Sequence, residues 1–344
     1  MITAFAKKYD LPSFRTRQFN EQFYKHGIPG WDSLTTWPAE LRAKLAEEVR
    51  FMTLEFELEL ISKNGDTEKV LLKREDGQRI EAVLMRHKDG RNTVCVSCMV
   101  GCPVNCSFCA TGKMGFGGNL SAREIIDQVM YFQRKLVLES ERVSNVVFMG
   151  MGEPMLNLKN VMEAIDILSD PDKLALGARR ITVSTSGYVP QFRQLMDSGF
   201  RGRVAISLHA PNQEVRARLM PVAKLFPLDQ LMATLDDYTA LTNKRISYEY
   251  VMIRNVNDRD EHARDLAKLL RGRLAHVNLI PYNPIREMPF KRSERDQIRR
   301  FTDILERAGV NVTVRVTMGD DVDAACGQLA DRANKANRDK KIRI

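Results

Sequence analysis

The sequence predicts an α/β protein in which a parallel sheet, covered by helices, curls into a full or partial barrel. Three observations lead to this fold class. Short apolar runs rich in β-branched residues alternate with amphipathic stretches of helical periodicity from residue 93 onward. Strand and helix alternating at this pitch form parallel sheets with helical crossovers. Polar or glycine-bearing segments follow five of the runs, at the strand ends where barrels gather their chemistry.

The expected strands of this barrel cover residues 93–96, 145–149, 181–184, 204–208, 246–252, 277–281 and 312–316. Helices expected between them cover residues 122–137, 158–168, 261–270 and 294–308. At 344 residues, the chain is long enough for one large catalytic domain and a small accessory one.

The chain before the barrel shows two different patterns. Apolar residues recur at helical spacing over 13–24 and 38–52, whereas polar and apolar residues alternate after residue 53, with turn signals at Asn64-Gly65-Asp66 and Asp76-Gly77. We therefore expect helices followed by a small antiparallel sheet. The predicted regions are an N-terminal helical accessory domain (1–52), a β-meander extension (53–90), the core barrel (91–318) and a C-terminal segment with a basic tail (319–344).

Composition and charge indicate the kind of partner and the cell compartment to expect for this protein. The chain has 53 Lys and Arg against 44 Asp and Glu, a net charge of +9 that suits an anionic partner but is weak evidence by itself. No apolar run is long enough to cross a membrane, and the N-terminus lacks the apolar core of a signal peptide. We expect a cytoplasmic protein with no membrane contact. In that reducing compartment, clustered cysteines favour metal or redox chemistry over structural disulfides.

Residues 95–118 hold five of the six cysteines. Three of them, Cys102, Cys106 and Cys109, form the spacing CxxxCxxC, which can supply three thiolates to a four-iron cluster and leave one iron open for substrate. Two other interpretations are buried thiols and structural zinc, the latter with Cys95 and Cys98 joining Cys102 and Cys106. The spacing and the barrel context favour the iron-sulfur cluster.

Further candidate residues lie where other strands end. Gly150 to Pro154 reads GMGEP, in which Glu153 offers a carboxylate to an ammonium group; Met155 replaces the third glycine of a dinucleotide fingerprint, and a plain turn is the alternative. The other candidates are small or neutral polar residues, which suit ribose hydroxyls and adenine when gathered at one edge. Each of them alone is also explained as a cap, a turn or a structural histidine: Ser184, Ser207, His209 and Asn283.

These motifs resemble those of known families. CxxxCxxC resembles the cluster motif of radical S-adenosylmethionine (SAM) enzymes. The segments PVNCSFCATGKMGFGG, VVFMGMGEPMLN, TVSTSG, AISLHAP, IPYNP and VTVRVTMGDDVDAACGQL, in this order, resemble the RlmN/Cfr family of RNA adenine methyltransferases. The likeness covers residues 81–329. It implies a radical SAM partial (β/α)6 barrel with the helical domain and β extension as accessories.

The resemblance also implies a role for each matching residue. Cys102, Cys106 and Cys109 would hold a 4Fe-4S cluster whose open iron binds SAM. SAM contacts are implied for Gly152, Glu153, Ser184, Ser207, Leu208, His209 and Asn283. Cys326 would become S-methylcysteine, Cys95 would be the resolving thiol that leaves a disulfide, and Glu81 would be the proton acceptor. Taken without the resemblance, Glu81 is equally a surface carboxylate and Cys326 a buried structural thiol.

The implied reaction methylates adenine, with two SAM molecules per turnover, because SAM as a methyl cation donor cannot methylate an electrophilic ring carbon directly. The RlmN type acts on carbon 2 of adenine in 23S rRNA and in tRNA, 3′ of the anticodon, and is our choice. Alternatives are a Cfr-type enzyme acting on carbon 8, which confers resistance to ribosome-directed antibiotics, a zinc RNA-binding protein, and an electron carrier. We expect a monomer served by an electron donor such as flavodoxin or ferredoxin.

Two features carry no assigned role. Cys98 is an extra thiol, since the family usually has serine at that position. Basic clusters could hold RNA phosphates, but the sequence does not show which of them face RNA. These clusters are Arg179-Arg180, Arg201 with Arg203, residues 216–218, and Lys291-Arg292.

Overall fold

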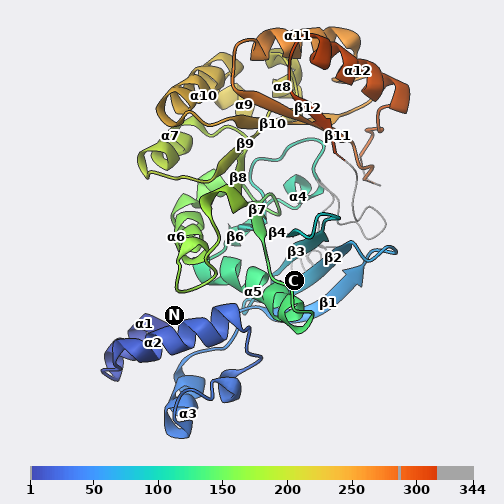
Figure 1. The fold of residues 1–344 in the computed structure, drawn as a ribbon. Helices are drawn as coiled ribbons and strands as arrows, with labels where there is room; N and C mark the ends of the chain where they lie inside the picture. The colour runs from blue at the N-terminus through green and yellow to red at the C-terminus, as the bar shows by residue number, and fades with distance from the viewer. Residues whose placement is uncertain (1, 286–287, 316–344) are drawn as a thin grey trace, which may run out of the picture.

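The computed structural model describes residues 2–285 and 288–315, and its centre is a ten-stranded mixed sheet (Figure 1). In spatial order, its strands are β1 (Glu55–Ile61), β2 (Thr67–Lys73), β3 (Arg79–Arg86), β4 (Asn92–Cys95), β7 (Asn145–Phe148), β8 (Ile181–Thr185), β9 (Arg203–Ser207), β10 (Ile246–Met252), β11 (Ala275–Pro281) and β12 (Val312–Val314). Neighbours from β4 to β12 are parallel, and those from β1 to β4 are antiparallel. The β extension therefore continues the core sheet at one edge.

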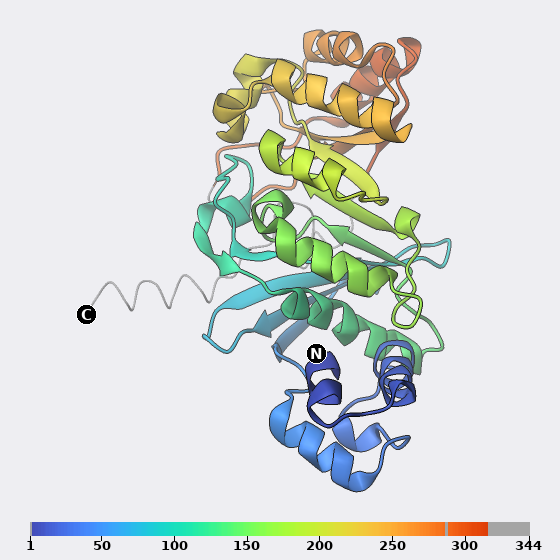
Figure 2. The same cartoon turned by 90° about the vertical axis from the view of Figure 1, so that its left-hand side faces the viewer.

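Amphipathic helices cover the outer face of this sheet (Figure 2). The helices of the core are α5 (Ala122–Leu138), α6 (Leu158–Ser169), α7 (Val189–Asp197), α8 (Gln213–Leu219), α9 (Val222–Leu225), α10 (Leu228–Thr242), α11 (Asp260–Leu270) and α12 (Arg295–Arg307). α5 begins at a capping box in which Ser121 and Glu124 each bind the other's backbone N–H. No helix in the described part of the chain is both long and apolar enough to traverse a bilayer.

The predicted fold class is confirmed. Each expected strand of the barrel forms, with ends shifted by a residue or two, because buried β-branched runs are a strong local signal. The pattern did not reveal a second, two-stranded sheet inside the cysteine-rich stretch, made of β5 (Met99–Gly101) and β6 (Phe116–Asn119). Both strands are very short, and β6 reads FGGN, so neither carries a strand signal of its own.

The N-terminal helices form a module that packs against α5. They are α1 (Ile2–Lys8), α2 (Ser13–Asn20), which continues as a π-helical turn (Glu21–Lys25), and α3 (Ala39–Glu48). The helix expected over 38–52 ends early, because Val49 is extended and its carbonyl accepts a hydrogen bond from Trp31 Nε1 at 2.7 Å. On α5, the Arg134 guanidinium lies over the rings of Phe23 and Phe51, at 5.1 and 4.7 Å. These contacts join the N-terminal helices to the core. The domain boundaries at residues 52, 90 and 318 stay a prediction.

The two faces of the sheet differ in polarity. Residues that face the helices are apolar, such as Ile80, Val94 and Val146, which are all fully buried. Strand register places the opposite set on the inner face. That inner set is largely polar and includes Lys69, Glu81, Cys95, Thr182, Ser184, Ser207, Glu249 and Asn278. The sheet curls toward this face, since Arg315, just after β12, reaches Met85 on β3 with Nη2 3.8 Å from Sδ.

Candidate active site

The three CxxxCxxC cysteines lie on one tight loop between β5 and α4 (Ala110–Lys113). The loop turns sharply at Gly101, where a Cβ would lie 1.9 Å from the Gly115 carbonyl oxygen, so only glycine fits. It is closed by hydrogen bonds from Cys102 N to Gly115 O (2.9 Å) and from Cys109 N to Cys106 O (3.2 Å). All three side chains are partly buried, against Phe108, Met220 and other apolar residues.

Burial keeps these thiols protonated until a metal binds them. It raises the pKa of Cys102 to about 12 and the pKa of Cys106 well above its usual range, and neighbouring thiols and Glu153 add to both shifts. Since thiolates rather than thiols bind metals, a cation must displace these protons. Cys102, Cys106 and Cys109 pack against one apolar cluster, so the loop holds their side chains in a common region.

The arrangement fits a multi-iron cluster better than a single metal ion. Among the described residues, no group of three or more His, Cys, Asp or Glu is placed to hold one metal ion. The three thiols of CxxxCxxC match the number of ligands that a four-iron cluster takes when one iron is left open. None of the five described cysteines is in a disulfide.

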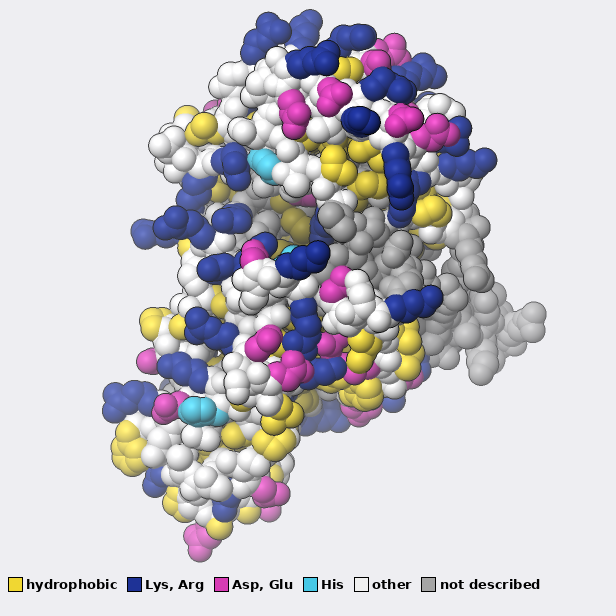
Figure 3. Space-filling model, turned by 45° about the vertical axis from the view of Figure 1, so that its right-hand side comes forward, with side chains coloured by type: hydrophobic (Ala, Val, Ile, Leu, Met, Phe, Trp, Pro, Cys, Tyr) yellow, Lys and Arg dark blue, Asp and Glu magenta, His cyan; other side chains and the backbone are white. Residues whose placement is uncertain are grey.

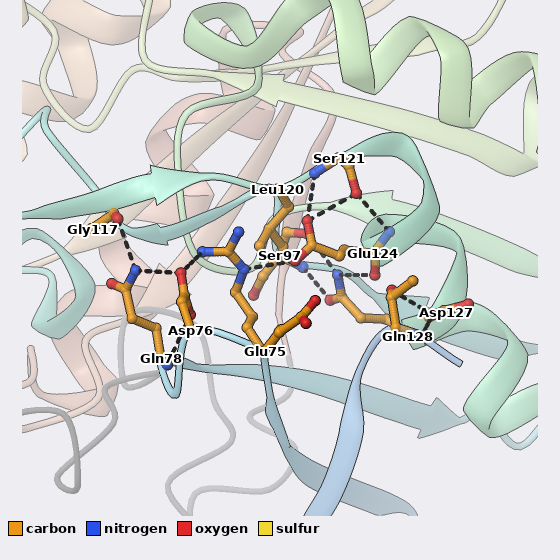
Figure 4. Close-up of polar contacts among 12 residues, drawn as sticks. Glu75, Asp76, Gln78, Ser97, Gly117, Leu120, Ser121, Glu124, Asp127 and Gln128 are labelled. Carbon is orange, nitrogen blue, oxygen red and sulfur yellow. Dashed lines mark hydrogen bonds and ion pairs between the residues drawn. The ribbon is translucent and has the colours of Figure 1, made fainter. Parts of the chain in front are cut away.

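The cysteine-rich stretch is braced from below by the β2–β3 turn and by α5 (Figure 4). Gln78 donates to the Gly117 carbonyl on β6 at 3.1 Å, and Arg74 pairs with Glu124 at 2.6 Å. On α5, Gln128 binds the backbone N–H and carbonyl of Ser97 at 2.8 and 2.9 Å. These contacts satisfy buried polar groups, and they fix the start of the stretch relative to the core.

Glu153 is buried beside the cysteine loop and is held by three donors. Its carboxylate accepts hydrogen bonds from Ser186 N (2.8 Å), Ser186 Oγ (2.7 Å) and Met155 N (3.1 Å). Burial raises the pKa of Glu153, which these hydrogen bonds partly oppose. The carboxylate also raises the pKa of Cys102 and Cys106, so it faces the cysteine loop. A ligand ammonium between them would find a partner for its charge.

The two glycines before Glu153 make room for the protein's own chain. At Gly152, where φ is +106°, a Cβ would lie 2.6 Å from Met99 Cβ, and at Gly150 it would lie 2.7 Å from Val96 O. We expected them to let the backbone approach a ligand. The close approach that the structure shows is to the segment that leads into the cysteine loop.

The predicted SAM contacts on the next strands gather at one edge of the sheet. Ser184 lies near the end of β8 and Ser207 is the last residue of β9, both half-buried on the inner face. Leu208 is fully buried, and its N–H donates to the Glu249 carbonyl at 3.1 Å. The structure thus brings these residues to the same side of the sheet as Glu153, as expected from parallel strands.

His209 is held in an unusual backbone conformation next to the cysteine loop. Its φ is +57°, its Nδ1 accepts from Val251 N at 3.0 Å, and its carbonyl accepts from Asn257 Nδ2 at 2.7 Å. Its ring meets Phe108 edge-on at 4.8 Å. Burial, aided by the positive charge of Arg216, lowers the pKa of His209 to about 3. The imidazole is therefore neutral, with its proton on Nε2 because Nδ1 is an acceptor.

Asn283 lies just after β11 and is buried, as a ligand-binding amide would be. Its Oδ1 accepts a hydrogen bond from the guanidinium of Arg292 at 2.8 Å, and Arg292 also donates to the Tyr282 carbonyl at 2.8 Å. Arg292 was expected as a candidate RNA contact. It is instead partly buried, and it orients Asn283.

Glu81 and Cys95 share the inner face of neighbouring strands. Cys95 on β4 pairs with Val83 on β3, and Glu81 lies two residues further along β3, so the two side chains point to the same side. Both are buried, and Lys69 Nζ lies 3.6 Å from Glu81 Oε1. Cys326 lies outside the described residues.

The sequence alone did not single out three residues that contact the site. Ser186 binds Glu153 through two groups; it lies in a segment that was flagged, but not as a site residue. Lys69 looks like an ordinary charged residue on an alternating strand. Arg216 was placed among the RNA-binding candidates, and this is wrong, since its side chain is 1% exposed. The sequence carries little evidence that Arg216 is buried, because a run of basic residues does not show which of its arginines faces the protein interior.

Known proteins resemble this chain in both fold and sequence. The crystal structure of a radical SAM methyltransferase from Sphaerobacter thermophilus superposes with a TM-score of 0.92 and 44% identity, covering 95% of each chain. A probable dual-specificity RNA methyltransferase RlmN from Symbiobacterium thermophilum is 45% identical over 94% of this chain and 87% of its own. A protein of the same description from Dictyoglomus thermophilum is 45% identical over 92% and 90%.

The fold and the site define a radical SAM enzyme, and residues 96–269 match the Radical SAM superfamily. Within this superfamily, the two RlmN relatives above are 45% identical to this chain over 94% and 92% of its length, which is enough to assign the chain to their family. The chain belongs to the RlmN family of RNA methyltransferases. Membership implies a 4Fe-4S cluster and SAM, and the zinc-module and electron-carrier alternatives are not supported.

Proposed function

We propose that this chain methylates carbon 2 of adenine in 23S rRNA, at the peptidyl transferase centre, and in tRNA, at the adenosine 3′ of the anticodon. The observation that carries this is the position of the buried Glu153 carboxylate. It lies next to the chain that leads into the loop of Cys102, Cys106 and Cys109, at the edge of a polar inner face that also holds Cys95 and Glu81. The names of the relatives, dual-specificity RNA methyltransferases, support RNA as the substrate.

Cys102, Cys106 and Cys109 would hold the 4Fe-4S cluster, and Glu153 with the strand-end residues would bind SAM. Held by these residues, the cluster would supply the electron for SAM cleavage, and SAM would supply both the methyl group and the radical chemistry that an inert ring carbon requires. Two SAM molecules would be used per turnover. The chain's own residues orient SAM through the Glu153 carboxylate, and the apolar side chains around the cysteine loop exclude water from this region.

Glu81, Cys95 and Cys326 would complete the transfer. The methyl group, first placed on Cys326 Sγ, would lose a hydrogen atom to the radical derived from SAM, and the carbon radical so formed would add to carbon 2. The adduct would then give up one electron to the oxidised cluster and its carbon 2 proton to Glu81. The Cys95 thiolate then attacks Cys326 Sγ, so that an S–S bond forms as the sulfur–carbon bond breaks, and the released electron pair takes up a proton to complete the methyl group. A dithiol reductant would restore both thiols.

RNA would reach the site by flipping the adenine out of its stack, with the backbone held by positive charge. Lys and Arg side chains are spread along the face in Figure 3, with Asp and Glu between them, so charge alone does not mark one binding surface. The exposed members of the expected basic clusters are Arg179, Arg180, Arg201, Arg203, Arg218 and Lys291. An electron donor such as flavodoxin or ferredoxin and a monomeric state complete the proposal.

Analysis of the methylated product distinguishes methylation of carbon 2 from methylation of carbon 8. Anaerobically reconstituted enzyme should convert protein-free 23S rRNA and tRNA to 2-methyladenosine, identified by mass spectrometry of nucleosides against standards. Methyl on carbon 8 would instead favour the Cfr-type alternative, and no methylated nucleoside from either RNA would overturn the proposal.

The cysteine roles are tested by matched substitutions. Cys106→Ala should lose the cluster, about four irons per chain, while Cys98→Ala, which removes another buried thiol from the same stretch, should keep it. Cys95→Ala should purify with covalently attached RNA, whereas Cys326→Ala should not. Equal iron in the first pair, or equal RNA in the second, contradicts the assignments.

A further inference from the structure

Arg216 on α8 is a buried charge at the centre of the site. Its side chain is 1% exposed, and it is among the largest fully buried side chains of the protein. Its Nη2 donates to the Ser186 carbonyl at 2.6 Å and to the Ser207 carbonyl at 3.4 Å. Arg216 therefore joins the ends of β8 and β9, next to the residue that holds Glu153.

No carboxylate in the described part of the chain pairs with Arg216, and its buried Nε has no hydrogen-bond partner there. Burying a guanidinium without a counter-charge is strongly unfavourable, and arginine is seldom fully buried unless it is paired. Burial lowers the pKa of Arg216 to about 10, which still leaves it charged at neutral pH. The described part of the chain therefore supplies no negative partner for Arg216.

The cysteine loop packs against the helix that carries Arg216, since Val215 and Leu219 of α8 share one apolar cluster with the side chains of Cys102, Cys106 and Cys109. Of the titratable groups, Cys106 is the one that raises the pKa of Arg216, and Arg216 in turn lowers that of Cys106. The same helix is tied to the cysteine loop, since Ser107 N donates to the Leu219 carbonyl at 2.9 Å. Three thiolates give a four-iron cluster a net negative charge, which increases by one on reduction.

We infer that Arg216 is the counter-charge of the iron-sulfur cluster and raises its reduction potential. This inference rests on the proposed assignment of Cys102, Cys106 and Cys109 as cluster ligands. Nearby positive charge favours the more negative, reduced state, and net charge around a cluster is one of the main determinants of its potential. A buried site makes the effect large because little water screens it. Arg216 is a positioning residue in this account, since it acts through the cluster and not on RNA.

A purely mechanical role is the competing explanation, because Arg216 also joins two strand ends. The two explanations differ in what the positive charge does. A mechanical brace affects folding and SAM binding, but leaves the potential of a fully loaded cluster unchanged. An electrostatic partner shifts that potential even when SAM is absent.

The experiment is a redox titration of the reconstituted holoprotein, followed by electron paramagnetic resonance of the reduced cluster, without SAM. Arg216→Gln and Arg216→Met remove the charge and keep most of the volume, and Arg216→Lys keeps the charge. Arg134→Gln is the matched control, because Arg134 is also largely buried with carbonyl and aromatic partners but contacts the N-terminal module. Iron content is measured first in every sample.

We expect either neutral variant to favour the oxidised cluster at least tenfold more than wild type, a shift of about 59 mV to lower potential for a one-electron couple. Arg216→Lys and Arg134→Gln should stay close to wild type. An unchanged potential in iron-loaded Arg216→Gln and Arg216→Met overturns the inference alone, as does a shift that appears only with SAM, which would assign Arg216 to the SAM carboxylate. Wild-type protein that binds no iron overturns the proposed function as well.

Discussion

Lys69 on β2 and Glu81 on β3 form a buried ion pair on the inner face of the sheet, with Nζ 3.6 Å from Oε1. Their side chains are 10% and 6% exposed, so water screens the pair poorly. The two residues lie on a diagonal of the antiparallel register, since Lys69 is opposite Val83 and Glu81 is opposite Leu71. The pair places a cation next to the carboxylate that we propose as the proton acceptor.

Replacement of Lys69 should impair Glu81 as a proton acceptor. Lys69→Met removes the cation that lies 3.6 Å from the buried Glu81 carboxylate, and breaking a buried ion pair costs about 3–5 kcal/mol. Release of RNA from the covalent adduct should slow about tenfold or more at pH 7. Gel analysis of adduct decay measures this. Lys73→Met, which breaks the exposed pair with Glu55, is the control and should decay like wild type.

Loss of charge at Glu153 should weaken SAM binding without loss of iron. Glu153→Gln keeps the size of the side chain but removes the charge that would face the SAM ammonium, and a charge-assisted hydrogen bond contributes about 1.5–3 kcal/mol. We expect SAM affinity to fall about tenfold to a hundredfold. Equilibrium binding to iron-loaded protein measures this, with the exposed Glu163→Gln on α6 as control. Equal affinity in both variants would argue against a SAM contact at Glu153.

The buried neutral His209 should make the protein less stable in acid. Its pKa is lowered to about 3 in the folded protein, so between this value and the ordinary value near 6.5 the unfolded chain binds one more proton. Stability is therefore lost as pH falls through that window, by about 1.4 kcal/mol between pH 7.5 and 5.5 for this one group.

His209→Asn removes the titrating group and tolerates the left-handed backbone. Urea unfolding at pH 7.5 and 5.5 should show a smaller acid loss in this variant than in wild type, although the variant is less stable overall. An identical pH dependence in the two proteins would mean that His209 is protonated in the folded state.

A side chain at Gly152 should displace the cysteine loop. In Gly152→Ala the new Cβ would meet Met99 at 2.6 Å, at a backbone φ of +106° that disfavours alanine. We expect a loss of at least about 2 kcal/mol in stability and a lower iron content after reconstitution. Gly177→Ala is the control, because no atom lies within 4 Å of its Cβ position and its φ is −60°. Full iron loading of Gly152→Ala would show that the loop adapts.

The sequence predicted much of the sheet and of the cysteine motif because both are local signals. A buried β-branched run such as Val204 to Leu208 predicts a strand by itself. Three cysteines within eight residues stay close together whatever the rest of the chain does. The hairpin of β5 and β6 was missed, since its strands are short and glycine-rich and depend on Gln78 and Gln128 from elsewhere. The glycines of GMGEP were assigned to a ligand, although they fit the protein's own chain.

The sequence by itself determined the fold class and the cysteine motif, because periodicity and spacing are properties of neighbouring residues. The roles of the site residues came from the resemblance to a known family. Only the tertiary structure decided how those residues are charged and paired. Arg216 changes from a presumed surface cation to a buried charge on the helix that packs against the cysteine loop, and Lys69 becomes the partner of Glu81. Burial and pairing depend on segments far apart in the chain, and desolvation makes their electrostatic effect large only once those segments meet.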